Sequence, residues 1–346
     1  MPSAGLATPM KALRVLLLLM LVGAAAAAGG AAWWLNRPMP LAADSVETSI
    51  EPGTSPRETA LAWAQAGVQA SPLLLYEWFR WSGLSRKIRA GSYEIGRGTT
   101  PIALLEKMVR GEEVLSTVRL IEGWTFRQFR GELAKADALK QTTTAFSDEQ
   151  LMQAIGAPGV APEGRFHPDT YAYSKGTSDV AVLKRAYRAM QKRLEAAWLE
   201  RAADTPLHSA EDALVLASIV EKETGAPSDR GRVAGVFVNR LRIGMPLQTD
   251  PTVIYGLGTA FDGNLRKRDL LADTPYNTYT RTGLPPTPIA MPGKAALLAA
   301  VRPDPTKALY FVARGDGSSE FSETLADHNR AVNQYQRGGQ RGKPGQ

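Results

Sequence analysis

The longest apolar run of the chain lies near its start, over residues 15–35, and contains no charged side chain. A helix rises about 1.5 Å per residue, so this run reaches about 31 Å and matches the hydrocarbon thickness of a bilayer. It ends in Trp33 and Trp34, at the level of an interfacial aromatic belt, and basic residues precede it. We therefore predict a membrane anchor over 15–35, with residues 1–14 in the cytoplasm. A cleaved signal peptide is the alternative, because the alanine run offers cleavage sites.

A short linker over 36–45 leads into a pattern of two strands and two helices. Apolar and polar residues alternate over 46–50, as in a half-buried strand, and a second strand is expected over 92–95. Between them, Ser55 opens a capping box, and a Ser-Pro pair starts a second helix. The order strand–helix–helix–strand resembles a LysM-like fold, which binds N-acetylated glycans in other proteins. We assign 46–118 to this module, with a packing or spacer role as the alternative to glycan binding.

A turn with glycine and threonine recurs three times in this part of the chain. The segments 50–54, 95–99 and 121–125 each follow an expected strand and precede an expected helix. Glycine supplies the turn, and the hydroxyl group caps the helix. A purely structural role and a ligand-binding role are both open for these segments.

Helices dominate the rest of the body, a larger domain over 119–336 that a flexible tail over 337–346 follows. The expected helices cover 125–136, 148–155, 179–201, 209–224, 228–241 and 325–335, and a strand covers 308–313. Glycine, proline, threonine and tyrosine accumulate over 244–292, which predicts a long and functional loop region. The predicted fold class is α+β: an N-terminal transmembrane helix, a small LysM-like α+β module, and a mostly helical domain with long loops and a short sheet.

The distribution of charge argues against a nucleic-acid partner. The net charge of +7 divides into +3 over residues 1–37, +3 over 337–346 and +1 for the body between them. A nearly neutral body lacks the basic stripe that phosphate binding requires. The chain of 346 residues has no cysteine and 3 scattered histidines, so we predict no metal site and no cofactor.

Carboxylates are left as candidates for catalysis, and the apolar helix over 209–224 carries the most informative one. At about 100° per residue, Glu221 lies beside the apolar face, in the last turn of the helix. Apolar surroundings and the negative end of the helix dipole both raise a carboxyl pKa, and a protonated carboxyl group near neutral pH can act as a general acid. Glu223 lies about 160° around the helix and cannot share a cleft with it. An ion pair of Glu221 with an arginine such as Arg230, Arg232 or Arg240 is the alternative.

Polar loops supply the candidates for substrate binding. Aromatic rings can cover sugar faces, and amide and hydroxyl groups between them can hydrogen-bond a neutral polysaccharide. Packing roles for the tyrosines and a turn cap for Asp250 are the alternatives. The substrate-binding candidates are Glu163, Asn239, Gln248, Thr249, Asp250, Tyr276, Asn277, Thr278 and Tyr279.

Four motifs resemble the YceG-like family in order and spacing: LASIVEKETG at 216–225, VFVNRLRIGMPLQTDPTVIYG at 236–256, YNTYTRTGLPPTPIAMPG at 276–293 and LADHN at 325–329. The resemblance covers about 45–336. The loop over 163–171 departs from the family, because His167 stands where phenylalanine is usual.

The resemblance implies a single-pass inner-membrane protein whose catalytic domain lies in the periplasm. It implies cleavage of nascent peptidoglycan strands between N-acetylmuramic acid and N-acetylglucosamine, without water, to leave a 1,6-anhydro end and terminate glycan elongation. The family's essential glutamate maps to Glu221, and peptidoglycan synthases are implied partners. Two alternatives are open: a hydrolase that pairs Glu221 with Glu163 or Asp250, and an inactive, membrane-tethered glycan-binding protein.

Overall fold

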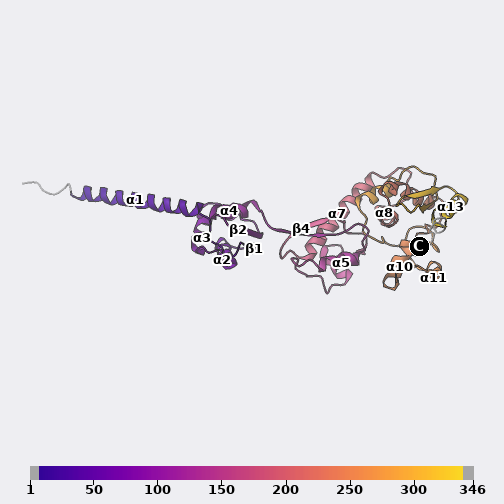
Figure 1. Ribbon diagram of the computed structural model, residues 1–346, viewed down its shortest axis with the longest axis horizontal. Coiled ribbons are helices and arrows are strands. Elements are labelled where there is room, and N and C mark those ends of the chain that lie inside the picture. The colour runs from indigo at the N-terminus through magenta and orange to yellow at the C-terminus, as the bar shows by residue number, and fades with distance from the viewer. Residues whose placement is uncertain (1–7, 338–346) are drawn as a thin grey trace, which may run out of the picture. The chain divides into compact units, whose positions relative to one another are not determined.

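The computed structural model describes residues 8–337 and shows a mixed fold of helices and small sheets (Figure 1). The chain divides into two compact units, Met1–Ser116 and Thr117–Gln346, and the division falls close to the boundary at 118 expected from sequence. The first residues of the predicted cytoplasmic segment (1–7) and almost all of the predicted tail (338–346) lie outside the described residues.

The first element, α1 (Thr8–Asn36), is a helix with exposed leucine side chains. Its stretch Leu13–Asn36 is long and apolar enough to cross a membrane, and none of its most apolar window is buried in the protein. An anchor and a signal sequence both meet these criteria, so the finding is compatible with the predicted anchor without selecting it over the alternative.

The rest of the first unit is a small module with its own apolar core. The predicted order strand–helix–helix–strand is confirmed, and the strands pair antiparallel from Ser45 opposite Gly96 to Ile50 opposite Gly91. The capping box at Ser55 is also present. The large buried side chains include Trp63, Phe79 and Tyr93. The elements are β1 (Ser45–Ile50), α2 (Pro56–Ala66), α3 (Pro72–Trp81), a 3-10 turn (Ser85–Lys87), β2 (Gly91–Gly96) and α4 (Pro101–Arg110).

The segment 36–45, which we expect to be a linker, is bonded to this module. Met39 is buried and its backbone N–H donates to the carbonyl oxygen of Thr99 at 2.9 Å. The N–H of Ala42 donates to the carbonyl oxygen of Gly67, also at 2.9 Å. The end of α1 is therefore fixed to the module through a short and well-bonded connection.

The second unit contains two apolar cores. The first core gathers Phe129, Met152 and Phe166 with residues of α7, and a small sheet of two strands borders it. This sheet pairs strands that are far apart in sequence, and the turn that follows its first strand leads into α5. The elements are β3 (Leu115–Arg119), α5 (Phe126–Ala134), α6 (Asp148–Ile155), β4 (Thr170–Ser174) and α7 (Asp179–Leu199).

The second core surrounds α8 (Ala210–Glu223), in which every residue from Ala213 to Val220 is buried. This helix packs against α9 (Arg230–Arg242), and the two helices predicted over 209–224 and 228–241 are thus confirmed. It also packs against α12 (Lys294–Val301), a helix that the sequence pattern does not predict. Because α8 is enclosed on all sides, its last turn is held rigidly at the edge of the core.

The prediction of a long irregular region over 244–292 is wrong in part. It contains α10 (Asp250–Leu257), a 3-10 turn (Gly258–Ala260) and α11 (Lys267–Leu271), whose shortness hides any apolar period. Further along, the strand expected over 308–313 is β5 (Tyr310–Ala313), and it pairs with the unpredicted β6 (Ser319–Ser322). The last helix is α13 (Leu325–Val332), which a π turn (Asn333–Arg337) extends.

Candidate active site

Glu221 lies on the last turn of α8, with 8% of its side chain exposed. Its Oε2 atom accepts a hydrogen bond of 2.8 Å from the backbone N–H of Gly293, directly before α12. Its Oε1 atom lies 3.9 Å from Nη2 of Arg230, the first residue of α9. The alternative ion pair with Arg230 is thus present, but it is long, and the hydrogen bond to Gly293 is the closer contact.

Burial is the main cause that raises the pKa of Glu221, as expected from its apolar surroundings. The negative charge of Glu122 raises this pKa further. The hydrogen bond from Gly293 lowers it, as do the positive charges of Arg230 and Lys222. The net effect is a pKa above the ordinary value for glutamate, the direction that a general acid needs.

Glu122 reaches this site from the turn before α5, and two glycines make the approach possible. The turn pairs with the segment before α12, because Gly123 N–H donates to the Met291 carbonyl at 2.9 Å and Met291 N–H donates to the Trp124 carbonyl at 2.8 Å. A Cβ atom on Gly293 would collide with the Glu122 carboxylate. Two carboxyl groups, Glu122 and Glu221, therefore meet at Gly293.

Sequence reasoning missed Glu122 as a site residue. It stands in the third of the recurring turns, at 121–125, where a structural role and a ligand role were both open. One feature of the sequence could have pointed to Glu122: it is an acidic residue directly before Gly123, in a turn that starts a helix. The missing information was the position of Gly293, about 170 residues later in the chain.

Glu223 contacts a different set of groups from Glu221, in agreement with the angle between them on the helix. It accepts a hydrogen bond from the Thr249 hydroxyl group. Burial raises the pKa of Glu223, and the nearby charge of Asp250 adds to this effect, while Thr249 and Arg240 lower it. The side chain of Arg240 is itself buried and donates to the carbonyl oxygens of Leu309 and Leu247, each at 2.7 Å.

Four of the predicted binding residues gather around Glu223 and not around Glu221. The Tyr279 hydroxyl group donates to Asp250 at 2.5 Å. The backbone N–H of Thr249 donates to the Thr278 hydroxyl oxygen at 3.1 Å, deep in the protein. The neighbouring Gln248 is exposed and has a φ of 48°, a left-handed conformation that is unusual for a residue other than glycine.

The remaining amide and aromatic candidates have structural partners. Asn239 donates to the carbonyl oxygens of Thr306 and Ala308. The buried side chain of Asn277 donates to three backbone carbonyl groups near the end of α11. Tyr276 shares a hydrogen bond of 2.8 Å with Thr287. Their roles in substrate binding stay predictions, with these contacts as the competing explanation.

The side chain of Glu163 is buried and contacts the first residue of α5, Phe126. Both of its carboxyl oxygens accept from the backbone N–H of Phe126, at 3.0 and 3.2 Å, and Tyr255 also donates to it. Burial raises the pKa of Glu163 to about 7. His167, the departure from the family pattern, is also buried, and burial lowers its pKa to about 4, so it is neutral in its pocket. The 163–171 loop therefore accommodates a neutral histidine where the family usually has phenylalanine.

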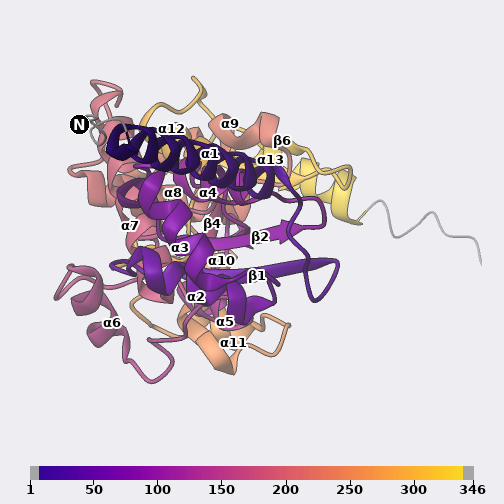
Figure 2. The same cartoon turned by 90° about the vertical axis from the view of Figure 1, so that its left-hand side faces the viewer.

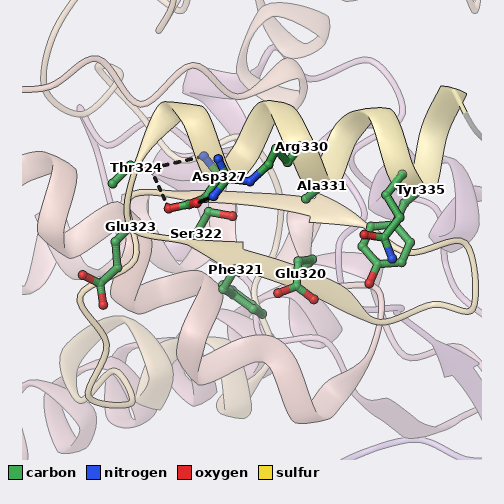
Figure 3. A pocket seen from close by; sticks show the side chains of 10 residues that line it. Glu320, Phe321, Ser322, Glu323, Thr324, Asp327, Arg330, Ala331 and Tyr335 are labelled. Atoms are coloured by element: carbon green, nitrogen blue, oxygen red, sulfur yellow. Dashed lines mark hydrogen bonds and ion pairs between the residues drawn. The ribbon is translucent and has the colours of Figure 1, made fainter.

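A cavity of about 580 Å³ lies elsewhere in the second unit, between β6 and α13 (Figure 3). Its lining is polar, and its charged groups are largely paired with each other or with nearby residues, as Asp327 is with Arg330 and Glu320 with Arg314. None of the groups around Glu221 or Glu223 lines it. The size of this cavity is therefore no guide to the reactive carboxyl group.

Comparison with known proteins places this arrangement in a family, because the YceG-like family pattern matches residues 48–334. The chain belongs to the YceG-like family. The endolytic murein transglycosylase of Bacillus subtilis is 31% identical over 317 residues, which cover 86% of this chain and 87% of that protein. The endolytic murein transglycosylase of Streptococcus pneumoniae is 26% identical over 333 residues, and the match spans only 60% of its length.

A solved structure supports the fold of this YceG-like protein. The crystal structure of a yceG-like protein from Listeria monocytogenes superposes with a TM-score of 0.52 at 28% sequence identity. The superposition covers 83% of this chain and 98% of the other. Both compact units of the chain thus contribute to the likeness, since neither alone amounts to that share.

Proposed function

We propose that this YceG-like protein is an endolytic murein transglycosylase, a lyase that cuts peptidoglycan strands between N-acetylmuramic acid and N-acetylglucosamine. Its relatives of that name cover most of the chain. The observation that carries the chemical proposal is the enclosed carboxyl group of Glu221, whose pKa burial raises. Among the described residues, its Oε2 atom has a close hydrogen bond and its Oε1 atom has the 3.9 Å contact with Arg230.

One carboxyl group suffices for this reaction. Protonated Glu221 gives its proton to the glycosidic oxygen as the bond from C1 breaks, through an oxocarbenium-like transition state. The resulting carboxylate then takes the proton of the sugar's own C6 hydroxyl group while that oxygen bonds to C1. The product is a 1,6-anhydro ring, no water is consumed, and Glu221 ends the cycle protonated.

The neighbours of Glu221 support each half of this cycle. Glu122 adds to the effect of burial in raising the pKa of Glu221, because a second negative charge nearby disfavours the ionised form. After proton transfer, the N–H of Gly293 and the side chain of Arg230 stabilise the carboxylate that forms. Glu122 comes from the turn before α5, Gly293 from the segment before α12, and Arg230 from the start of α9.

Product analysis tests the proposal. Uncrosslinked glycan strands are digested with the purified full chain, and the products are measured by mass spectrometry. We expect 1,6-anhydro ends and internal cuts, with no mass added. Products that gain the mass of one water molecule per cut would show a hydrolase, and an absence of cuts would contradict enzymatic function.

A hydrolase is the second candidate, and the position of Glu122 is the observation that favours it. The sequence suggested Glu163 or Asp250 as a second carboxyl group, but Glu163 binds the start of α5 and Asp250 lies beside Glu223. Glu122 instead meets Glu221 at Gly293 and could activate a water molecule. The same mass measurement on a Glu122→Gln variant decides: a hydrolase would lose water-containing products, whereas a lyase keeps its anhydro products.

We also propose that α1 stays uncleaved and anchors the chain in the inner membrane, with the catalytic unit in the periplasm, beside the synthases whose strands it terminates. The small module is proposed to be LysM-like, with glycan binding and a packing or spacer role both open for it. The length and apolar surface of α1 support the anchor. We expect the protein to stay with membranes after a high-salt wash. A mature N-terminus near residue 31, with protein in the soluble periplasm, would contradict the anchor.

A further inference from the structure

The helix α3 of the small module has an exposed apolar face that the catalytic site does not explain. Leu73, Leu74 and Trp81 are 66%, 50% and 76% exposed. At about 100° per residue, these three side chains fall within about 100° of each other on the helix. The opposite side of α3 carries Leu75 and Phe79, which are buried in the module's core. A helix on a water-exposed surface normally has polar residues on its outer face, so this one is suited to a partner.

The charges around this face are mostly positive. One acidic residue, Glu77, lies on the same side of α3, four residues from both Leu73 and Trp81. Its charge is paired with Arg80 at 2.9 Å, and it accepts a hydrogen bond of 3.0 Å from the Trp81 indole N–H. The 3-10 turn that follows α3 adds Arg86 and Lys87, both exposed. An apolar face bordered by basic side chains is typical of segments that lie in the interface of an anionic membrane.

The module is fixed close to the end of α1. Trp34, in the last turns of that helix, packs against the module's core, and α1 also contacts α4. Two residues, Arg37 and Pro38, separate the end of α1 from buried Met39. Three residue steps span about 10 Å at most, so the module cannot leave the level at which α1 emerges.

The side of the module that faces back along α1 is the side with α3. Figure 1 shows α3 at the end of the module nearest to α1, with β1 and β2 farther along, and Figure 2 shows α4, the helix that contacts α1, between α1 and α3. If α1 crosses the bilayer, α3 therefore lies on the side of the module that is nearer to the outer headgroups.

We propose that the outer face of α3 lies in the interfacial layer of the membrane, with its leucines and Trp81 at the boundary of the acyl chains and with Arg86 and Lys87 on anionic headgroups. The proposal rests on the proposed anchor. It gives the module a second contact with the lipid besides α1, and this contact holds the module flat against the membrane surface. A glycan partner suits the face less, because two of its three exposed apolar residues are aliphatic and offer no hydrogen bonds to sugar hydroxyl groups.

The absence of cysteine from the chain makes a direct test possible, since any introduced cysteine is the only thiol. Three variants of the full chain carry one cysteine each: Leu74→Cys on α3, Glu51→Cys on the turn after β1, and Leu18→Cys in α1. Each is labelled with a polarity-sensitive fluorophore and reconstituted into vesicles of phosphatidylethanolamine and phosphatidylglycerol. Nitroxide-labelled lipids then report contact between the probe and the bilayer.

We expect quenching at Leu74 to be at least about two-fold stronger than at Glu51, because an interfacial helix buries its apolar face in the headgroup boundary. Quenching at Leu18 checks the anchor separately. Quenching at Leu18 with none at Leu74 overturns the proposal for α3 and leaves the anchor intact. A lack of quenching at both positions overturns the anchor and the proposal together. If the probe fluorescence at position 74 changes on addition of soluble glycan strands and nitroxide-labelled lipids do not quench it, the outer face of α3 binds glycan. That result would also overturn the proposal of a membrane contact.

A charge-reversal variant tests the role of the basic turn. With the probe at position 74, Arg86→Glu combined with Lys87→Glu should weaken the quenching in anionic vesicles and leave it unchanged in zwitterionic ones. If the charge reversal changes the quenching equally in the two kinds of vesicle, Arg86 and Lys87 do not bind anionic headgroups. The thermal transition of each variant in detergent, compared with that of the parent, excludes loss of the fold as the cause.

Discussion

Glu221 and Glu223 lie two residues apart on the last turn of α8, and their surroundings differ in kind. Glu221 has one close hydrogen bond, from a backbone N–H, and a long ion pair with Arg230. Glu223 is more deeply enclosed and belongs to a network with Thr249, Asp250 and Arg240. The pKa of both is raised by burial, so a raised pKa alone does not distinguish a reactive carboxyl group from a structural one. The neighbours distinguish the two: Glu122, Arg230 and the N–H of Gly293 surround Glu221, whereas Glu223 lies among Thr249, Asp250 and Arg240.

The strongest test of this contrast exchanges each carboxyl group for an amide of the same size. We expect Glu221→Gln to lower turnover of glycan strands by about 1,000-fold or more, because the group that gives and later takes the proton is removed. The matched Glu223→Gln variant should keep most of its activity, since an amide oxygen can still accept from Thr249. Rates and thermal transitions of both variants are measured together. An inactive Glu223→Gln beside an active Glu221→Gln would reverse the assignment.

The contact at Gly293 provides a second test. A Cβ atom in Gly293→Ala would collide with the Glu122 carboxylate and push that side chain away from its position beside Glu221. We expect turnover to fall about 10- to 100-fold, because a shift of about 1 Å in a catalytic group has effects of this size. Gly131→Ala is the matched control, since a Cβ there meets nothing within 4 Å. Full activity of Gly293→Ala would mean that the two carboxyl groups do not depend on this close approach.

We expect the charge of Glu122 to affect the pH dependence of turnover. Its charge raises the pKa of Glu221, so Glu122→Gln should lower that pKa. The general acid is active in its protonated form, and the decline of the rate at alkaline pH should therefore begin at a lower pH than in the parent. A rate profile against pH checks this, with the exposed Glu195→Gln as control. An unchanged alkaline limb would show that Glu122 does not act on Glu221.

Glu163 should behave as a structural carboxyl group and change turnover least. Its pKa is raised from 4.5 to about 7, so the folded state gains stability below pH 4.5 and loses this gain as pH rises toward 7. The Glu163→Gln variant has no carboxyl group to ionise at this position. Between pH 4 and pH 8, the unfolding free energy of the parent should therefore fall by on the order of 3 kcal/mol more than that of the variant. Denaturant unfolding at the two pH values measures the difference. A large loss of turnover with unchanged stability would instead support substrate binding by Glu163.

Local sequence signals located most of the helices correctly. The capping boxes at Ser55, Thr125 and Ser147 each satisfy the backbone of a helix start, and such bonds form between residues three apart whatever the rest of the fold does. The apolar pattern of α8 also placed Glu221 in a last turn beside a buried face. The helix α6 was predicted although it has only eight residues, and it starts with the capping box at Ser147. The helices α10 and α11 were missed because they are as short or shorter, and α10 starts without a side-chain cap.

The polar loops show the limit of reasoning from sequence about a site. Thr249, Asp250 and Tyr279 were expected around the substrate, on the grounds of their side-chain types and their concentration in one stretch. In the structure they lie around Glu223. The side-chain amide of Asn277 donates to backbone carbonyl groups a few residues before it, such as that of Ala272. Hydrogen-bonding side chains fit a ligand or a backbone equally well, and the sequence does not record which partner is near.

The sequence by itself determined the apolar length of α1, the capped starts of the helices and the angle that separates Glu221 from Glu223, because each depends on residues within a few positions of one another. Only the tertiary structure decided which loops meet at the end of α8. Gly293 approaches Glu122 and Glu221 because α12 packs against α8 and the turn before α5 pairs with the backbone at Met291. These contacts join segments far apart in the chain, and their free energy comes from burial of the shared core, which a local pattern does not specify.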